Sequence, residues 1–261
     1  MIRFMYFLAP LAAALYAPSI TSLNTPKTFV STQKSFFRLG DQVLQIDKFS
    51  STESLPYQLV SLHNDETNLI ASARSFVSES GGSLVLLNNK GNRKVEATLM
   101  DHDLQFDPSF IFTTWGRKQA LDKTHTSDRR SSQQLEQFAR FLITALEEQK
   151  ITVELHAQCA GSYTIASFKK DGALEKTARI VYENPAQDPS SYFITNSQEA
   201  FDRLKARQQN VVYQNLHGLK DDGSLKIYFL RAAKPYVQVV SVKDQEGSQL
   251  RLLNSLKEAL Q

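Results

Sequence analysis

Hydrophobic and polar positions along the chain follow two different periods, which predict strands interleaved with helices. Short apolar or alternating runs between turn residues are typical of strands, and they are found at 56–63, 83–87, 95–99, 151–156, 163–168, 192–195, 211–214, 225–230 and 236–242. Apolar residues three and four positions apart are typical of helices, and they are found at 67–80, 132–149, 197–207 and 250–260. Strands that alternate with helices imply an α/β fold in which helices cover both faces of a sheet.

The first 20 residues have the layout of a secretory signal peptide. The basic residue Arg3 precedes an apolar run at 4–17, and Pro18 and several polar residues follow that run. The run is short for a helix that spans a bilayer, and an uncleaved anchor and a buried N-terminal helix are the alternatives. We therefore expect a secreted or periplasmic protein that is not stably inserted in a membrane once the signal has been removed.

The rest of the chain divides into two parts by composition. Residues 21–54 contain many serine, threonine and lysine residues, and we interpret them as a linker and edge segment. Residues 55–261 contain the predicted strands and helices and are expected to form one α/β domain. The whole chain of 261 residues is 41% hydrophobic and 22% charged, which is ordinary for a soluble globular protein.

The charge distribution argues against nucleic acid as a partner. The formal net charge is +3, and lysine and arginine are scattered rather than gathered into a basic stripe. The single cysteine, Cys159, excludes an intrachain disulfide. We expect a monomer that does not bind nucleic acid.

Two of the five histidines follow predicted strands at positions that suit a metal. His63 and His156 lie at the C-terminal ends of their strands, where ligands collect in open α/β sheets. Glu66 lies three residues after His63, at a corner between a strand and a helix. Zinc accepts imidazole and carboxylate ligands, and a catalytic zinc site has three protein ligands and one open position. From the residues alone, the alternative is a solvated histidine and a glutamate favoured by the helix dipole.

Several segments resemble a bacterial family related to the zinc carboxypeptidases, and they are similar to the succinylglutamate desuccinylase and aspartoacylase group as well. They include LVSLHNDET, GGSLVLL, FDPSFIFT and VELHAQCAGSYTI, and the resemblance extends over about residues 55–255. It implies that His63, Glu66 and His156 are zinc ligands. It also implies a three-layer α/β/α sandwich with a mixed sheet. The implied function is zinc-dependent hydrolysis of an amide bond in a peptide, cell-wall peptides included, or in a small amide.

The sequence departs from that family where a substrate carboxylate would be held. The family has an Asn-Arg pair in the segment that reads FDPSFIFT in this chain, and Ser109 and Phe110 replace the pair. A phenyl ring cannot bind a carboxylate as an arginine does. Arg117 and Arg231 are the candidates for this role, with ordinary exposed arginines as the alternative.

A second departure concerns the catalytic base. The family's glutamate aligns with Val240, which cannot accept a proton. Asp244, Glu246 and Glu154 are the candidate replacements. Glu154 shares a strand face with His156 but lies one pleat deeper, which favours a supporting role. The alternative function is therefore a degenerate, non-catalytic member of the fold that binds a metal or a peptide.

The other reactive and aromatic residues have simpler interpretations. Cys159 is a candidate fourth ligand or nucleophile, although an isolated cysteine is more often a small buried hydrophobe. Phe110, Phe112 and Trp115 line either an apolar substrate pocket or the core, and the core is favoured. Three histidines in polar surroundings are expected at the surface: His102, His125 and His217. A zinc-free scaffold protein is the third function that we consider.

Overall fold

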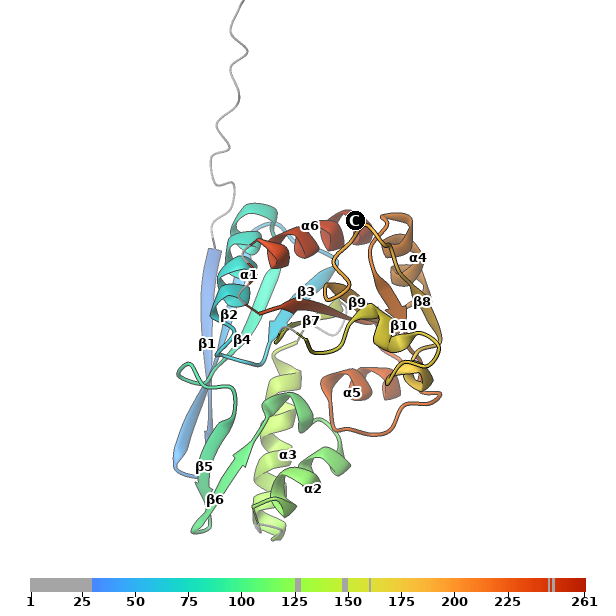
Figure 1. Ribbon diagram of the computed structural model, residues 1–261. Coiled ribbons are helices and arrows are strands. Elements are labelled where there is room, and N and C mark those ends of the chain that lie inside the picture. Colours follow the sequence, from blue (N-terminus) through green and yellow to red (C-terminus); the bar gives the residue numbers. More distant parts are fainter. Residues whose placement is uncertain (1–29, 125–127, 147–149, 160, 244, 246) are drawn as a thin grey trace, which may run out of the picture.

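The computed structural model describes residues 30–124, 128–146, 150–159, 161–243, 245 and 247–261. The predicted signal peptide at 1–20 lies outside these residues. Within them, nine strands form one sheet in the order β1-β2-β4-β3-β7-β11-β9-β10-β8 (Figure 1). The strands of this sheet are β1 (Val30–Leu39), β2 (Gln42–Ser51), β3 (Tyr57–Ser61), β4 (Ser83–Asn88), β7 (Ile151–Gln158), β8 (Ile180–Tyr182), β9 (Tyr192–Thr195), β10 (Val211–Tyr213) and β11 (Tyr236–Val242).

The sheet mixes parallel and antiparallel pairs. β3 is parallel to both of its neighbours, β4 and β7, and β11 is parallel to β7. The C-terminal ends of β3, β7 and β11 therefore lie along one edge of the sheet. β1 and β2 pair as an antiparallel hairpin at the margin, so the sheet extends N-terminal to the domain boundary expected at residue 55.

Helices cover both faces of this sheet, which confirms the three-layer α/β/α sandwich. One face is covered by α1 (Thr67–Ser80), α4 (Gln198–Ala206) and α6 (Ser248–Leu260). The other face is covered by α2 (Thr114–Asp122), α3 (Arg129–Thr144) and α5 (Leu225–Arg231), together with the two-stranded sheet of β5 (Val95–Leu99) and β6 (His102–Phe106). Three short 3-10 helices are η1 (Pro108–Phe110), η2 (Ile165–Phe168) and η3 (Glu175–Thr177). None of the described helices is long and apolar enough to cross a membrane.

The predicted helices are present, with differences of a few residues at their ends. α1 has the predicted bounds of 67–80. α3 begins at residue 129 rather than 132, because the Asp128 carboxylate accepts hydrogen bonds from the amides of Arg130 (2.8 Å) and Ser131 (3.0 Å). The last predicted residues of this helix, 147–149, lie outside the described residues.

Two segments predicted as strands are helical, and these predictions were wrong. Residues 225–230 belong to α5, because the Ser224 hydroxyl accepts a hydrogen bond from the Ile227 amide (3.3 Å) and caps the helix. α5 is buried on several sides, and the period of so short an apolar run does not distinguish a buried helix from a buried strand. Residues 163–168 contain η2, where Thr164 and Ser167 form a capping box.

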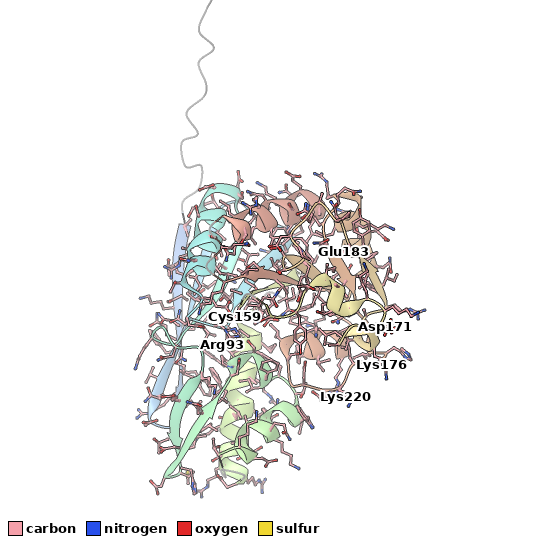
Figure 2. All side chains as sticks on the ribbon, in the orientation of Figure 1. Arg93, Cys159, Asp171, Lys176, Glu183 and Lys220 are labelled. Atoms are coloured by element: carbon pink, nitrogen blue, oxygen red, sulfur yellow. The ribbon has the colours of Figure 1, made fainter. Side chains whose placement is uncertain are left out.

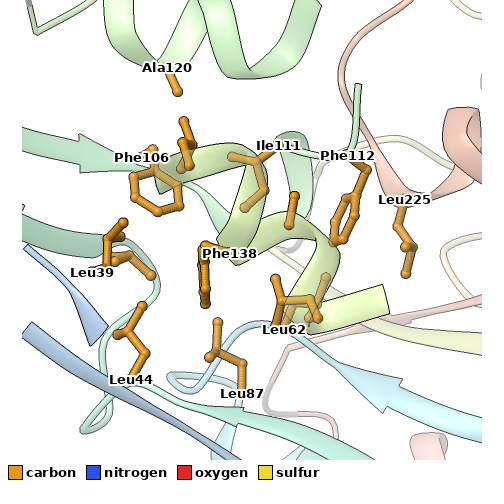
Figure 3. Packing of buried hydrophobic residues seen from close by; sticks show 14 of the residues in the cluster. Leu39, Leu44, Leu62, Leu87, Phe106, Ile111, Phe112, Ala120, Phe138 and Leu225 are labelled. Atoms are coloured by element: carbon orange, nitrogen blue, oxygen red, sulfur yellow. The ribbon is translucent and has the colours of Figure 1, made fainter. Parts of the chain in front are cut away.

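Phe138 of α3 lies at the centre of the core between α3 and the sheet (Figure 3). Its side chain is fully buried, and its ring packs against Phe37 (centroids 5.4 Å apart) and Phe106 (6.1 Å). The same core contains Leu62, which precedes His63. Packing around Phe138 therefore supports the strand end from which the candidate site begins.

Gly116 and Gly223 pack their backbones against each other next to η1. A Cβ atom at Gly116 would lie 2.5 Å from the Cα atom of Gly223 and 2.2 Å from the carbonyl oxygen of Phe110. The Phe112 amide donates to the Gly223 carbonyl (2.9 Å), which joins the turn before α5 to the segment that leads into α2. A residue without a side chain is required at this contact.

Gly116→Ala is expected to destabilise the protein by about 1–3 kcal/mol, because overpacking forces the two backbones apart. Alanine in place of glycine stabilises an unconstrained helix by up to about 1 kcal/mol, so the sign of the change reports the contact. Urea denaturation measures it. Lys118→Ala, at an exposed position of the same helix, is the control and should stay within about 0.5 kcal/mol of the wild type. A Gly116→Ala protein as stable as the control would contradict the contact.

Candidate metal centre

The structure brings the three predicted ligands to one edge of the sheet. His63 lies two residues after β3, and His156 lies within β7, which is next to β3 and parallel to it. Glu66 occupies the N-cap position of α1, the helix that follows β3. The parallel pairing of β3 and β7 therefore places both imidazoles beside the start of α1.

The ligand atoms of His63, Glu66 and His156 lie within 4.8 Å of one another. The Nδ1 atoms of His63 and His156 lie 3.2 Å and 3.9 Å from Oε1 of Glu66. Zinc bonds to imidazole and carboxylate measure about 2.0–2.2 Å, so one ion fits between these atoms after small side-chain rotations. Two imidazoles and one carboxylate form a donor set that zinc accepts. The residues therefore fit zinc, and their role as its ligands stays a prediction.

Asp107 and Ser109 hold the outer edge of the His63 imidazole. Oδ1 of Asp107 lies 2.8 Å from Nε2 of His63, and Oγ of Ser109 lies 3.1 Å from the same nitrogen. Asp107 is the N-cap of η1 and also accepts a hydrogen bond from the Ser109 amide (2.9 Å). A carboxylate on Nε2 fixes the tautomer and orientation of the ring and leaves Nδ1 to face a metal.

Asp107→Asn is expected to lower the zinc affinity about 10–100-fold, because the amide lacks the charge that makes the His63 ring a stronger ligand. Competition against a chromophoric zinc chelator measures the affinity. Asp103→Asn, which changes an exposed carboxylate on β6, is the matched control and should bind zinc like the wild type. Equal affinities for the two variants would show that Asp107 does not support a zinc ligand.

Glu66 is buried and held at both carboxylate oxygens. Its Oε2 accepts a hydrogen bond from the Ala157 amide (3.0 Å), and its Oε1 accepts one from the Arg93 guanidinium (3.0 Å). Ala157 follows His156 directly in β7, so the first hydrogen bond fixes Glu66 against the neighbouring ligand. A ligand that is already held in place loses less conformational freedom when a metal binds.

Arg93 is a candidate functional residue that the sequence did not reveal. Its guanidinium lies 3.0 Å from the Glu66 carboxylate, 3.7 Å from that of Asp65 and 3.9 Å from that of Asp107. The side chain, labelled in Figure 2, is 38% exposed, so it lies between the buried ligands and solvent. Arg93 lies 30 residues after His63, at no distance typical of a motif. The only hint in the sequence was its position just before the alternating strand at 95–99.

The pKa values of the two histidines shift in opposite directions. Burial alone would lower the pKa of His63, but the hydrogen bonds and charges of Asp107 and Glu66 outweigh it and raise this pKa to about 9. Burial lowers the pKa of His156. Burial would raise the pKa of Asp107, but the hydrogen bond and the charge of His63 prevail and lower it. In the metal-free protein at neutral pH, His63 is therefore protonated and Asp107 is ionised.

The zinc affinity is expected to rise with pH, because zinc must displace the proton of His63. Zinc binds a neutral imidazole, and His63 is protonated below its pKa of about 9 in the metal-free protein. The affinity should therefore increase by up to about tenfold per pH unit below that value and level off above it. Calorimetry in two buffers of different ionisation enthalpy measures the proton released per zinc. Binding at neutral pH without proton release would contradict this assignment.

The two arginines predicted to hold a substrate carboxylate make hydrogen bonds outside the ligand cluster. Arg117 donates to the carbonyl of Ile111 (3.2 Å) and to the hydroxyl of Thr114 (3.4 Å). Arg231 donates to the carboxylate of Asp221 (2.7 Å). These bonds fasten the segments that lead into α2 and α5. A role for either arginine in substrate binding stays a prediction.

Val240 lies directly beside His156. The two residues are paired in the register of β11 and β7, and Val240 is 3% exposed within an apolar cluster. Glu154 lies one pleat deeper on the same face and accepts a hydrogen bond from the Tyr236 hydroxyl. Burial raises the pKa of Glu154 to about 7. Two further candidate bases lie outside the described residues: Asp244 and Glu246.

Among the described residues, the group of clustered ligand atoms consists of His63, Glu66 and His156 and does not include Cys159. Cys159 is exposed in the loop after β7 (Figure 2), so it is not the buried hydrophobe that an isolated cysteine often is. His102 and His217 are exposed, as expected. His125 lies outside the described residues.

Three solved structures that are similar to this chain are described as members of the groups that the sequence motifs resemble. An aspartoacylase family protein from Mesorhizobium loti MAFF303099 is 13% identical with a TM-score of 0.46, and 88% of this chain and 67% of that chain are covered. The succinylglutamate desuccinylase from Chromobacterium violaceum is 10% identical, with a TM-score of 0.44 and coverages of 87% and 68%. A "putative metallopeptidase" from Shewanella baltica OS155 is 16% identical, with a TM-score of 0.42 and coverages of 87% and 83%. No family model and no curated protein matches the sequence.

Proposed function

We propose that the protein is a zinc-dependent hydrolase of amide bonds in peptides or small molecules. The observation that supports this most directly is the convergence of His63, Glu66 and His156 within 4.8 Å, beside the ends of two parallel strands. Three protein ligands leave one coordination position open, which distinguishes catalytic zinc sites from structural ones.

His63, Glu66 and His156 would hold the zinc ion. When bound, zinc supplies a Lewis acid that polarises a carbonyl oxygen and lowers the pKa of a water molecule. Asp107 and Ser109 hold the His63 ring in one orientation through its Nε2 atom. The chain thus supplies a centre whose geometry is set before the substrate arrives.

Arg93 supplies positive charge beside this centre. It is hydrogen-bonded to Glu66 and partly exposed, so its guanidinium lies between the buried candidate ligands and solvent. A pre-organised cation stabilises the negative charge that develops on a carbonyl oxygen in the transition state of amide cleavage. We assign that role to Arg93 in the proposed reaction.

The proposed turnover is slow, because no carboxylate replaces Val240 among the described residues of β11 that share its face. A positioned general base typically adds about 10²–10⁴-fold in rate. Glu154 is buried and accepts a hydrogen bond from Tyr236, which favours a structural role for it.

The burial of Val240 favours a second candidate function, which is metal-dependent binding without cleavage. Its apolar side chain packs in a closed cluster next to His156. A wall of this kind contains no group that accepts a proton. In this case His63, Glu66 and His156 would hold the metal, and a peptide or an amide would bind beside them without being cleaved.

Amide hydrolysis by the wild type and by His63→Ala, each with one equivalent of zinc, tests the proposal. The substrates are N-acylated amino acids, peptide amides and cell-wall peptides. The hydrolase proposal expects turnover by the wild type that falls to background in His63→Ala, while His217→Ala, at an exposed histidine, stays active. Equal rates in wild type and His63→Ala would contradict it. Zinc-dependent binding without turnover would favour the second candidate.

We also propose that the protein is exported. The order of Arg3, the apolar run at 4–17 and Pro18 supports this. Mass spectrometry of the protein recovered outside the cytoplasm is expected to find a mature N-terminus at about residues 17–22. Exported protein that retains residues 1–17 would contradict signal cleavage.

A further inference from the structure

A cavity of about 350 Å³ lies beside the candidate metal centre. Its apolar lining includes Phe106, Phe110, Trp115 and Ala120, from β6, η1 and α2. Gly116 also lines it, at the close backbone contact with Gly223. A volume of this size accommodates a single aromatic or branched side chain together with a few neighbouring atoms.

Two aromatic rings that line the cavity are exposed instead of packed in the core. Phe112 is buried in the core as expected, but Phe110 and Trp115 are 43% and 46% exposed, so the expectation of core packing is wrong for these two. Large apolar side chains that are exposed around a cavity next to a candidate active site mark a binding surface. An apolar ligand group that covered both rings would gain their hydrophobic contact.

The cavity is joined to the metal centre by two residues of one short segment. Asp107 lines the cavity, and its carboxylate lies 2.8 Å from the His63 imidazole. Phe110 follows Ser109, whose hydroxyl lies 3.1 Å from the same imidazole. Asp107 therefore lies between the cavity and His63, at the Nε2 edge of the imidazole, while Nδ1 faces the other candidate ligands.

The charges around the cavity favour an uncharged occupant. Lys94 and Lys123 line it together with Asp107 and Asp222, so charges of both signs are present. The Lys94 ammonium donates a hydrogen bond to Gln105 (3.1 Å), and no arginine lines the cavity among the described residues. The two ammonium groups and the two carboxylates balance, so neither an anion nor a cation gains a net charge attraction there, whereas a neutral apolar group contacts the aromatic lining.

We propose that this cavity is a subsite for an aromatic or large aliphatic side chain of the substrate. This inference rests on the proposed function, since it names the substrate group next to the amide bond that the metal centre would act on. The chain thus selects amides of apolar residues, whereas a terminal carboxylate contributes little to recognition. The replacement of an Asn-Arg pair by Ser109 and Phe110 is then a change of specificity.

The test uses Trp115, which is the only tryptophan of the protein, so its fluorescence reports the occupancy of this cavity directly. The full-length protein is titrated with N-acetyl-phenylalaninamide, and with N-acetyl-aspartic acid amide as the charged counterpart. The first ligand should change the Trp115 emission saturably, and the second should not. Phe110→Ala should weaken the binding of the first about tenfold. Phe36→Ala, at an exposed phenylalanine that does not line the cavity, should bind like the wild type.

Two further outcomes separate this inference from the proposed function. Saturable binding of the phenylalanine amide without any hydrolysis would sustain the subsite and overturn the hydrolase. Hydrolysis of amides with no preference for apolar residues would sustain the hydrolase and overturn the subsite. The subsite is equally overturned by an unchanged Trp115 emission, by an equal response to the charged ligand, or by full affinity in Phe110→Ala.

Discussion

Replacing His63 by alanine is expected to weaken zinc binding on the order of 10³-fold. Zinc binding of about 10–16 kcal/mol is shared among four ligands in small zinc domains, so the loss of one ligand removes several kcal/mol. His63 is also the residue that joins Asp107 to the centre. His156→Ala tests the same site with less disturbance of the core, because the His156 side chain is 30% exposed.

Chelator competition measures these affinities, and circular dichroism shows whether each variant is folded. His102→Ala and His217→Ala remove exposed histidines and should bind zinc like the wild type. Free zinc at 100 times Kd should stabilise the wild type by about 2.7 kcal/mol and stabilise His63→Ala and His156→Ala little. An unchanged affinity in either ligand variant would place the zinc elsewhere on the protein.

Phe138→Ala is expected to lower the free energy of unfolding by about 3–5 kcal/mol, the largest effect of a single core substitution that we predict. The ring is fully buried and packs against Phe37 and Phe106, so its removal leaves a cavity that α3 and the sheet cannot close. Phe36→Ala is the matched control, because Phe36 neighbours Phe37 on β1 but is 59% exposed.

Urea denaturation measures the free energy of unfolding of both variants. An unchanged m-value shows that the substitution altered stability alone. Phe36→Ala should stay within about 0.5 kcal/mol of the wild type. If Phe138→Ala lost less than about 1 kcal/mol, the core drawn around Phe138 in Figure 3 would be wrong. The site would then lack the packing that fixes Leu62 and the start of the loop to His63.

The hydrophobic period predicted the helices and strands that bury one face. It failed for an element that is buried on several sides and for a strand that is mostly exposed. α1 was predicted with its observed bounds because its apolar residues recur at helical spacing. α5 was predicted as a strand, since Leu225, Ile227 and Phe229 alternate in the sequence; the structure shows that all three are buried in a helix. β1 and β2 were missed in part because most side chains of β1 are exposed, and its hairpin is held by backbone pairing that leaves no apolar pattern.

The convergence of the three candidate metal ligands was predictable because two of them lie near the C-terminal ends of strands and the third opens the next helix. β3 and β7 are parallel neighbours, so residues at their C-terminal ends meet. Arg93 and Asp107 were not predictable in this way. They lie on either side of the β5–β6 hairpin, where Val95 pairs with Phe106, so the hairpin returns the chain and places both beside Glu66 and His63. Contacts of this kind depend on tertiary structure that local periods do not encode.

The central claim is that His63, Glu66 and His156 hold one zinc ion, and an anomalous difference map at the zinc edge tests it most directly. A crystal of the protein grown with one equivalent of zinc should show a single strong peak at bonding distance, about 2.0–2.2 Å, from Nδ1 of both histidines and from the Glu66 carboxylate. A peak at Cys159 or at the exposed histidines, with none between these three side chains, would contradict the account.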